Sequence, residues 1–347
     1  MSQFWIEQGD AAEALKLIPS GSVDALVTDP PAGISFMDKE WDGAKGGRDK
    51  WIAWLAGILR ECLRTMKPGA YGWVWALPRT SHWTATACED AGFAVRDVLV
   101  HVFGTGFPKS RSLLKPAAEH WILIKAPGEL RELRIEENRI AGAVGSGHWT
   151  HKRQIGDGNI YGGGGQTEQD FGSINPASGR WPANFTLSHC DDCADTCVED
   201  CPVRLLDEQS GELKSGAIHH KAGDDFTGEW RKREDRTDPQ KRTKDVAYKS
   251  DSGGASRFFY QAKPSTKERS LGLPSRNTHP TVKSIALMRH LIRLIAAPGS
   301  LILDPFTGSG STAVAAIEEG CRFVGIEQDP QHAETARLRA QHALSRR

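Results

Sequence analysis

Apolar and polar positions follow two rhythms in residues 1–126 and again in residues 256–347. Short continuous apolar runs are typical of parallel strands that are buried on both faces. Such runs predict strands at 4–7, 23–28, 71–76, 95–103, 120–126, 300–304 and 322–327. Between them, apolar residues recur at helical spacing, most clearly over 51–66 and 283–296. This alternation predicts an α/β fold, with a mostly parallel sheet covered by helices on both faces.

The rhythm fails between residues 127 and 255, where glycine-rich and charged segments replace it. A segment of this composition predicts an inserted, partly irregular region. We therefore expect three parts, residues 1–126, 127–255 and 256–347. Within the insertion, residues 229–249 hold eight basic and five acidic side chains. This stretch is the best local candidate for contact with phosphate groups.

A glycine-rich turn lies in the sequence LILDPFTGSGSTAVAA, residues 301–316. A predicted strand ends in an acid, a Gly-x-Gly turn follows, and a helix begins at once. Gly308 and Gly310 let the backbone adopt positive φ and approach a ligand closely. The N–H groups at the start of the helix can bind an anionic or polar ligand. Glu327 ends the next strand, where its carboxylate can accept both hydroxyls of a ribose.

Taken alone, this turn also fits the dinucleotide pattern of nicotinamide and flavin oxidoreductases. The chain order argues against that alternative, because only 20 residues follow Glu327. A dinucleotide-binding domain needs several more strands after its first unit. The missing strands lie at the front of the chain, so the predicted sheet is circularly permuted.

A second motif, TDPPAGI, covers residues 28–34 and follows the apolar run 23–28 directly. Proline fixes its own φ and has no N–H for a sheet ladder. The strand must therefore stop here, with Asp29 held at its carboxyl end on a stiffened backbone. Such a carboxylate is either an ordinary loop residue or a reactive group placed beside a ligand.

The two motifs in this order resemble the DNA amino-methyltransferases of the beta arrangement. The sequences GDAAEALKLIPSGSVDALVTDPP and HPTVKSIALMRHLI carry the same resemblance, which covers about residues 1–126 and 256–347. It implies a permuted Rossmann-like sheet that binds S-adenosylmethionine, with the target-recognition region in the middle of the chain. The implied reaction transfers a methyl group to the exocyclic amine of a flipped base in double-stranded DNA.

The resemblance also implies which residues bind the cofactor. They are Asp10, Thr281, Lys283, Asp304, Phe306, Gly308, Gly310 and Glu327. In this assignment Asp304 lies near the methionine amine, Phe306 packs on the cofactor and Glu327 binds the ribose. The two glycines allow the close approach.

Three members of this set have a plain structural alternative. Asp10 is a candidate for the adenine end of the cofactor, and it could equally cap a helix, which would not exclude that contact. Thr281 and Lys283 are candidates for the methionine carboxylate. Their alternatives are an ordinary helix cap and a solvated lysine.

Asp29, Pro30 and Pro31 are the predicted catalytic residues. The lone pair of an exocyclic amine is delocalised into the base, so the nitrogen is a poor nucleophile. If Asp29 and the Pro30 carbonyl accept its two N–H bonds, the nitrogen can pyramidalise toward the methyl group. Adenine-N6 is favoured because cytosine-N4 members of the family often begin this loop with serine, and cytosine-N4 stays the alternative. Cytosine-C5 methylation is excluded, because it needs a Pro-Cys pair that the chain lacks.

The loop departs from the family pattern at Ala32, where an aromatic residue usually stacks on the flipped base. Stacking on an aromatic ring contributes about 1–3 kcal/mol per base. Phe36 and Trp41, in the same loop, are candidates to supply that ring. The alternative is that both rings are core anchors and that the chain is a catalytically weak DNA-binding module.

A cysteine cluster lies inside the insertion, at Cys190, Cys193, Cys197 and Cys201. Four thiolates suffice for a tetrahedral structural zinc, with His189 as an alternative ligand. The alternative is a set of reduced thiols in a loop. Methyl transfer to an amine needs no metal.

The composition of the chain limits which kinds of partner it can bind. The 347 residues include 44 basic and 44 acidic side chains, so the formal net charge is +0 and any DNA-binding surface must be local. No run approaches about 18 apolar residues, and the first residues show no signal-peptide pattern. We expect a cytoplasmic protein without a membrane partner.

Overall fold

The computed structural model describes residues 3–34, 43, 45–104, 106, 111–141, 179–193, 196–214, 218–220, 246–248, 251–263, 265 and 267–347. The chain forms two compact units. The first consists of Met1–Asn138, Pro182–Leu205 and Phe259–Arg347, and the second of Arg139–Trp181 and Leu206–Phe258. The cysteine cluster therefore belongs to the first unit, together with both segments that resemble methyltransferases.

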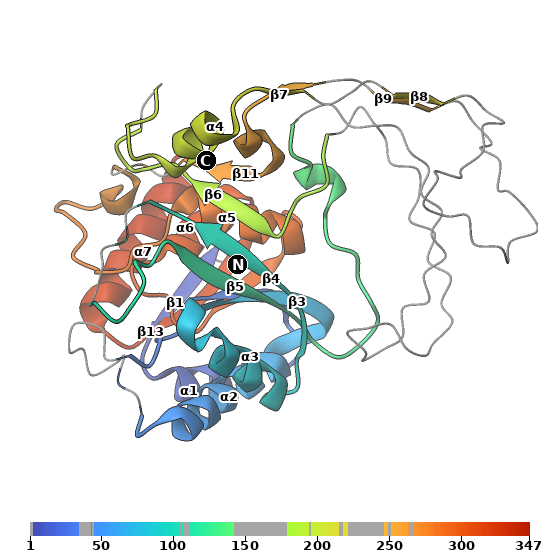
Figure 1. Cartoon of the computed structure of the whole chain (residues 1–347). Helices are drawn as coiled ribbons and strands as arrows, with labels where there is room; N and C mark the ends of the chain where they lie inside the picture. Colours follow the sequence, from blue (N-terminus) through green and yellow to red (C-terminus); the bar gives the residue numbers. More distant parts are fainter. Residues whose placement is uncertain are drawn as a thin grey trace, which may run out of the picture. The chain divides into compact units, whose positions relative to one another are not determined.

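A nine-stranded sheet forms the centre of the first unit (Figure 1). Its order is β1 (Phe4–Gln8), β13 (Arg322–Glu327), β12 (Leu301–Asp304), β2 (Val23–Thr28), β3 (Met66–Ala76), β5 (Ala118–Lys125), β4 (Ala94–Val102), β6 (Phe185–Ser188) and β11 (Tyr260–Ala262). Strand β5 is antiparallel to β3 and β4, and the other pairings are parallel. The predicted α/β class is confirmed.

Strands from the two ends of the chain interleave. β1 pairs with β13, and β12 pairs with β2 in a register that sets Leu303 opposite Leu26. This pairing confirms the circular permutation. The direction of strand succession reverses between β12 and β2, which is where ligands bind in open parallel sheets. The carboxyl ends of these two strands carry Asp304 and Thr28.

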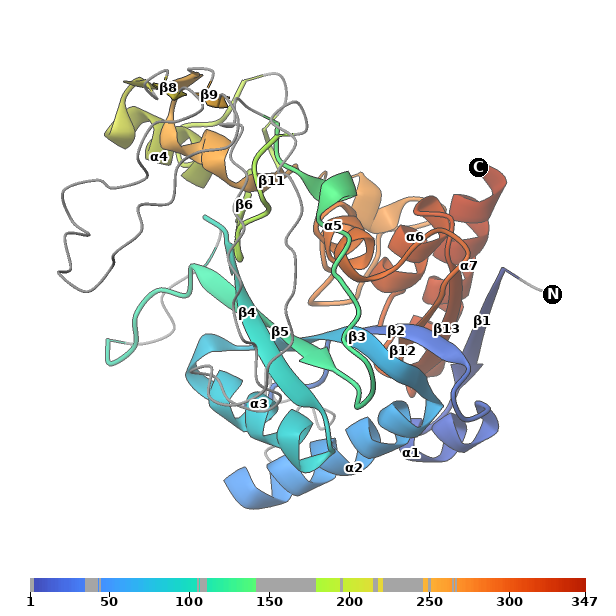
Figure 2. The same cartoon turned by 90° about the vertical axis from the view of Figure 1, so that its right-hand side faces the viewer.

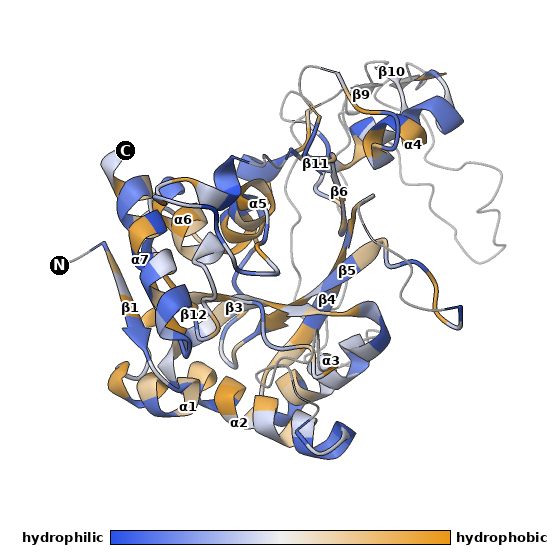
Figure 3. Ribbon diagram, turned by 90° about the vertical axis from the view of Figure 1, so that its left-hand side faces the viewer, coloured by the Kyte–Doolittle hydropathy of each residue, from blue (hydrophilic) through white to orange (hydrophobic). Residues whose placement is uncertain are grey.

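Helices cover both faces of this sheet (Figure 2). Helices α1 (Ala11–Ala14), α2 (Arg48–Thr65) and α3 (Ser81–Asp90) pack on one face. Helices α5 (Ile285–Ile295), α6 (Ser311–Glu318) and α7 (Pro330–Ser345) pack on the other face. Figure 3 shows the same two layers, and α2 presents both hydrophobic and hydrophilic residues along its turns. Each layer has its own buried core against the sheet.

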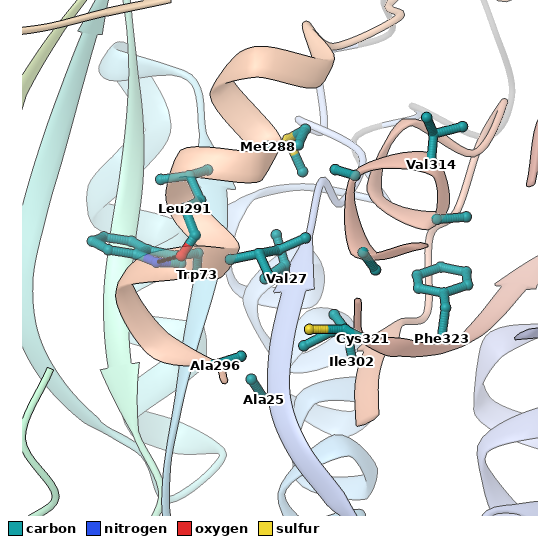
Figure 4. Packing of buried hydrophobic residues seen from close by; sticks show 14 of the residues in the cluster. Ala25, Val27, Trp73, Met288, Leu291, Ala296, Ile302, Val314, Cys321 and Phe323 are labelled. Atoms are coloured by element: carbon teal, nitrogen blue, oxygen red, sulfur yellow. Dashed lines mark hydrogen bonds between the residues drawn. The ribbon is translucent and has the colours of Figure 1, made fainter. Parts of the chain in front are cut away.

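The packing of α5 fixes the segment before it relative to β2 and β3 (Figure 4). The Trp73 indole is buried and donates from Nε1 to the Leu291 carbonyl at 3.0 Å. Met288 and Leu291 are buried in the same cluster as Val27. Helix α5 begins at Ile285, two residues later than the apolar pattern predicts, because the Ser284 hydroxyl caps it by accepting from the Leu287 amide at 3.5 Å.

Strands β6 and β11 extend the sheet, and the sequence did not predict either of them. They pair in parallel from Tyr260 opposite Thr186 to Ala262 opposite Ser188. Helix α4 (Pro202–Ser210) follows the cysteine cluster. Among the described helices, none has the length and apolar character needed to cross a membrane.

The second unit contains two small antiparallel ladders among its described residues. β7 (Leu213–Lys214) pairs with β10 (Ser252–Gly253), and β8 (Ile218–His220) pairs with β9 (Val246–Tyr248). An isolated antiparallel bridge joins Ile140 to Arg180. Most of the basic stretch 229–249 lies outside the described residues.

Candidate active site

The glycine-rich turn connects β12 to α6 with a backbone that only glycine accommodates. Gly308 has φ of 53° and Gly310, the N-cap of α6, has φ of 84°. A Cβ on Gly310 would lie 2.8 Å from Ala336 Cα, and one on Gly308 would lie 3.0 Å from His279 Nε2. The backbone of α7 and the segment before α5 therefore approach this turn closely. A side chain at either position would strain the backbone and displace a neighbour.

Glu327 lies at the end of β13, beside the same turn. Its Oε2 accepts from the Gly308 amide at 2.7 Å, and its Oε1 accepts from the Asp329 amide at 2.9 Å. Burial raises the pKa of Glu327, against the lowering effect of these two amides. Because each carboxylate oxygen has two lone pairs, both can still accept from a neighbouring diol. The geometry fits a ribose.

Asp10 follows the neighbouring strand, β1. Its Oδ1 accepts from the amides of Ala12 at 2.9 Å and Glu13 at 3.3 Å, so it caps α1. The adjacent Gly9 amide donates to the Glu327 carbonyl at 2.9 Å. Asp10 is therefore a helix cap that also lies at the strand end next to Glu327.

Asp304 is 1% exposed and makes its hydrogen bonds inside the protein. Its Oδ1 accepts from the Thr28 hydroxyl at 2.7 Å and from the Phe306 amide at 3.1 Å, and its Oδ2 accepts from the Thr312 hydroxyl at 2.6 Å. Burial raises the pKa of Asp304 to about 7, although these donors favour the ionised form. The side chain thus joins β12, β2 and α6, and fixes the start of the glycine-rich turn.

Phe306 lies in that turn and packs against α2. Its ring centroid is 5.8 Å from that of Trp54, at an interplanar angle of 49°. Both rings are half-buried. A half-buried ring at this position leaves part of its surface for contact with a cofactor.

The Asp-Pro-Pro loop begins directly after Thr28, the last residue of β2. Pro30 is buried and Asp29 is half-buried. Gly33 has φ of 71°, and a Cβ there would overlap the indole of Trp51, which is 1% exposed. The loop is therefore seated firmly on α2. Phe36 and Trp41, the candidates for stacking on a base, lie outside the described residues.

Lys283 connects the Asp-Pro-Pro loop to a buried acid. Its Nζ lies 3.3 Å from Asp29 Oδ2, 3.2 Å from Glu119 Oε2 and 4.1 Å from the centre of the Trp75 ring. Burial alone would lower the pKa of Lys283, but the carboxylates of Asp29 and Glu119 outweigh it and raise that pKa. The solvated-lysine alternative is therefore wrong. The structure places this ammonium beside the Asp-Pro-Pro loop.

Glu119, on β5, links Lys283 to polar side chains on β4 and β6. Its Oε2 accepts from Trp75 Nε1 at 2.6 Å, and its Oε1 lies 2.8 Å from His101 Nδ1. His101 Nε2 lies 2.7 Å from Ser188 Oγ. Burial alone would raise the pKa of Glu119, but Lys283 and the hydrogen bonds from His101 and Trp75 lower it. We call Lys283, Glu119, His101 and Ser188 the buried network.

Sequence reasoning missed this network beyond Lys283. The signal was weak, because β4 and β5 also hold other ionisable residues, such as Asp97 and His120, beside His101 and Glu119. Thr281 lies two residues before Lys283 and precedes α5, where its amide donates to His279 Nδ1 at 3.3 Å. The alternative assignment of Thr281 as the cap of this helix is therefore wrong, because Ser284 is the cap.

The group of possible metal ligands at the cysteine cluster differs from the predicted set by one residue. Ligand atoms of four residues lie within 4.8 Å of one another, namely those of His189, Cys193, Cys197 and Cys201. Cys190 is not in this group, because its thiol donates to the Asp200 carbonyl at 3.8 Å. His189, the residue directly after β6, is the fourth member of the group instead.

Similarity to known proteins agrees with this geometry. A family model described as DNA methylase matches residues 23–338. DNA adenine methyltransferase YhdJ of Escherichia coli (strain K12) is 43% identical over 54 residues, which is 16% of this chain and 18% of YhdJ. The chain thus matches less than a quarter of the length of the curated relatives.

Solved structures extend the comparison to nearly the whole chain. PvuII DNA methyltransferase, described as cytosine-N4-specific, has a TM-score of 0.52 at 12% identity, covering 98% of this chain and 86% of its own. The M1.HpyAVI–SAM complex has a TM-score of 0.46 at 16% identity, covering 97% and 99%. At these identities the likeness concerns the fold.

The permuted sheet and its glycine-rich turn define a Rossmann-like methyltransferase. The family match covers most of the chain, and the chain belongs to the N6/N4 family of DNA methylases. Membership confirms S-adenosylmethionine as the cofactor that the motifs implied, and it argues against the oxidoreductase alternative. The described turn, with its two tight glycines and the carboxylate of Glu327, fits that cofactor.

Proposed function

We propose that this chain methylates the N6 amine of adenine in double-stranded DNA. S-adenosylmethionine supplies an electrophilic methyl group on a sulfonium. The observation that carries the proposal is the placement of Asp29, which follows β2 beside the glycine-rich turn and is held by Lys283 at 3.3 Å. A carboxylate there can accept a hydrogen bond from an amine that faces the methyl donor.

The residues of the loop divide the chemistry among them. Asp29 and the Pro30 carbonyl accept the two N–H bonds of the amine, which frees its lone pair for direct attack on the methyl group. The prolines hold both acceptors in place before the base arrives, so little reorganisation is needed during the reaction. Ala32 stands where the family usually has an aromatic residue. Phe36 is the first candidate to supply the stacking ring in its place, and Trp41 is the second.

Two residues outside the Asp-Pro-Pro loop hold Asp29 in position. Lys283 holds the Asp29 carboxylate in position, and Glu119 holds Lys283. The ammonium is thereby shared between two acids, which leaves Asp29 able to accept a hydrogen bond from the substrate. In this proposal Lys283 is a positioning residue, and its predicted contact with the methionine carboxylate is replaced by this role.

Cytosine-N4 is the second candidate substrate. The same acceptors would serve its amine, and the fold is shared with a cytosine-N4 enzyme. Adenine is preferred because the loop begins with Asp, and because YhdJ, the adenine methyltransferase, matches part of the chain.

The test is methyl transfer to DNA that contains all four bases, followed by digestion and mass spectrometry of the nucleosides. We expect N6-methyladenine. N4-methylcytosine alone would overturn the choice of base, and no methylated nucleoside would favour a DNA-binding module without catalysis.

A variant then tests the role of Asp29. Asp29→Ala should reduce the transfer rate by about a hundredfold or more, the scale of losing a preorganised polar group at a reacting centre. Its affinity for S-adenosylmethionine, measured by calorimetry, should stay within a few-fold of wild type, because Asp29 acts on the base. Turnover at the wild-type rate would show that Asp29 is only a loop acid.

A further inference from the structure

The loop between β6 and α4 brings together four side chains that can each offer a ligand atom to a metal ion. His189 follows β6 directly, and Cys201 directly precedes α4. Together with Cys193 and Cys197, their ligand atoms all lie within 4.8 Å of one another. None of the four takes part in the proposed methyl transfer, so the cluster needs an explanation of its own.

The distances match those around a tetrahedral ion. Zinc bonds of about 2.3 Å to sulfur and about 2.05 Å to nitrogen place a sulfur and a nitrogen ligand roughly 3.6 Å apart in a tetrahedron. His189 Nδ1 lies 3.3 Å from Cys197 Sγ and 3.5 Å from Cys201 Sγ. A small shift outward from these positions would accommodate the ion.

The other side of the imidazole is arranged as metal-binding histidines usually are. His189 Nε2 lies 3.3 Å from the side-chain oxygen Oε1 of Gln261, on β11. A proton on Nε2 that is donated to this oxygen leaves the lone pair on Nδ1, which faces the sulfur atoms. Partners of this kind fix the tautomer and ring orientation of metal ligands. The His189 amide also donates to the Ala262 carbonyl at 2.9 Å, so β11 holds both ends of the residue.

We propose that His189, Cys193, Cys197 and Cys201 bind one structural zinc ion. Three thiolates and an imidazole in a tetrahedron are a donor set typical of zinc. The four protein ligands complete the coordination, so no position is left for a substrate, and the role of the ion is structural. A disulfide between two of the thiols would leave the third thiol and the imidazole without their common partner.

Cys190 has a different role in this arrangement. Its carbonyl accepts from the Cys193 amide at 3.1 Å, which forms the turn that presents Cys193 to the cluster. Its thiol donates to the Asp200 carbonyl at 3.8 Å. Cys190 therefore shapes the loop without binding the ion, and it offers a matched control for the ligand cysteines.

The proposed ion lies next to strand β6, so it also affects the stability of the sheet. His189 is adjacent to Ser188, whose hydroxyl lies 2.7 Å from His101 Nε2 in the buried network. Strand β6 has only four residues and pairs with β4 and β11. By holding the residue after β6, the zinc centre stabilises the outer edge of the sheet that carries this network.

The wild-type full chain provides the first test. Native mass spectrometry and elemental analysis of protein purified without chelator should find one zinc per chain. X-ray absorption at the zinc edge should give three sulfur ligands and one nitrogen. Folded wild type without zinc, or with a disulfide in this loop, would overturn the proposal, and four sulfur ligands would overturn the assignment of His189.

Paired variants provide the second test. Cys197→Ser should lower the zinc content well below one per chain, whereas Cys190→Ser should keep it at one. Circular dichroism and binding of S-adenosylmethionine verify that both variants are folded. A folded Cys190→Ser protein that loses zinc as Cys197→Ser does would contradict the ligand set. If Cys197→Ser does not fold, the ligand count from the wild-type absorption spectrum decides.

Discussion

The pKa values of two buried acids in this site, Asp304 and Glu119, are shifted in opposite directions. The partners of each side chain explain the difference. Asp304 has hydroxyl and amide donors but no cation among its hydrogen-bond partners, so burial raises its pKa to about 7. Glu119 has Lys283 at 3.2 Å, and its pKa is lowered despite burial. The neutral donors of Asp304 offset only part of the effect of burial on its pKa, whereas Lys283 together with His101 and Trp75 outweighs burial at Glu119.

The raised pKa of Asp304 predicts a pH dependence of stability. The folded pKa of about 7 lies above the unfolded value, so the native state binds more protons than the unfolded state between about pH 4 and 7. The contribution of Asp304 to stability is therefore present at low pH and is lost as the pH rises through this window, by up to about 1.4 kcal/mol per pH unit. Denaturant unfolding of wild type and Asp304→Asn at several pH values measures it. The difference between the two proteins should change with pH, and parallel curves would contradict the shift.

At this scale the sequence predicted the residues that belong to a motif and missed those that meet across the fold. The Asp-Pro-Pro and Gly-x-Gly residues were predictable because local chain geometry restricts them. Glu119 contacts residues 18 and 164 positions away, His101 and Lys283, and no local pattern reports such distances. The direction of His189 depends on how β6 ends against β11, which the spacing of the cysteines alone does not contain.

The buried network connects three strands and the segment before α5 to the Asp-Pro-Pro loop. Glu119 lies on β5, His101 on β4 and Ser188 on β6, while Lys283 precedes α5 and reaches Asp29 after β2. Removing one member of a buried charged pair is far more costly than removing an exposed one. The network is therefore expected to matter for both stability and turnover.

Glu119→Gln tests the positioning role. The amide keeps the size of the side chain but removes the charge, so Lys283 should bind Asp29 more tightly and compete with the substrate amine. We expect kcat to fall by about tenfold, equivalent to roughly 1.4 kcal/mol, with KM for DNA and affinity for S-adenosylmethionine unchanged. The high-pH limb of kcat should also move to lower pH, because Lys283 loses one of the two acids that raise its pKa.

The control is Glu137→Gln, which removes an exposed carboxylate 2.9 Å from Arg134. Such a surface pair contributes about 0–1 kcal/mol, so its loss should leave kcat and its pH profile as in wild type. Equal effects of the two substitutions, or a rise in KM alone for Glu119→Gln, would argue against positioning by Glu119.

The elements themselves were predictable in proportion to their length and periodicity. Long amphipathic helices such as α2, with 18 residues, and buried strands such as β2 carry a strong pattern. Strands β6 and β11 have four and three residues and lie beside polar segments, so periodicity is too short to indicate them. They form because β4 offers a sheet edge for β6, and β6 then offers one for β11.

The whole molecule is organised around a sheet assembled from both parts of the chain. β1 and β2 come before the second unit in sequence, and β12 and β13 come after it, yet they form one continuous sheet. The chain leaves this unit at Asn138 and returns at Pro182. Between these points, Ile140 and Arg180 exchange two backbone hydrogen bonds of 2.9 and 2.7 Å, so the ends of this excursion lie side by side.

This bridge permits a direct test of whether residues 142–178, within the predicted target-recognition region, contribute to recognition of the DNA target. Residues 142–178 can be replaced by a short Asn-Gly linker, because a backbone pair such as Ile140 and Arg180 can be closed by a tight turn. The variant should bind S-adenosylmethionine with wild-type affinity, since the predicted cofactor residues all lie in the first unit. Its KM for DNA should rise by about tenfold or more, or its sequence preference should be lost.

Asp29→Ala is the matched comparison, because it should lose transfer while keeping DNA affinity. A deletion variant that methylates the same sites at the wild-type rate would show that target recognition lies elsewhere in the chain.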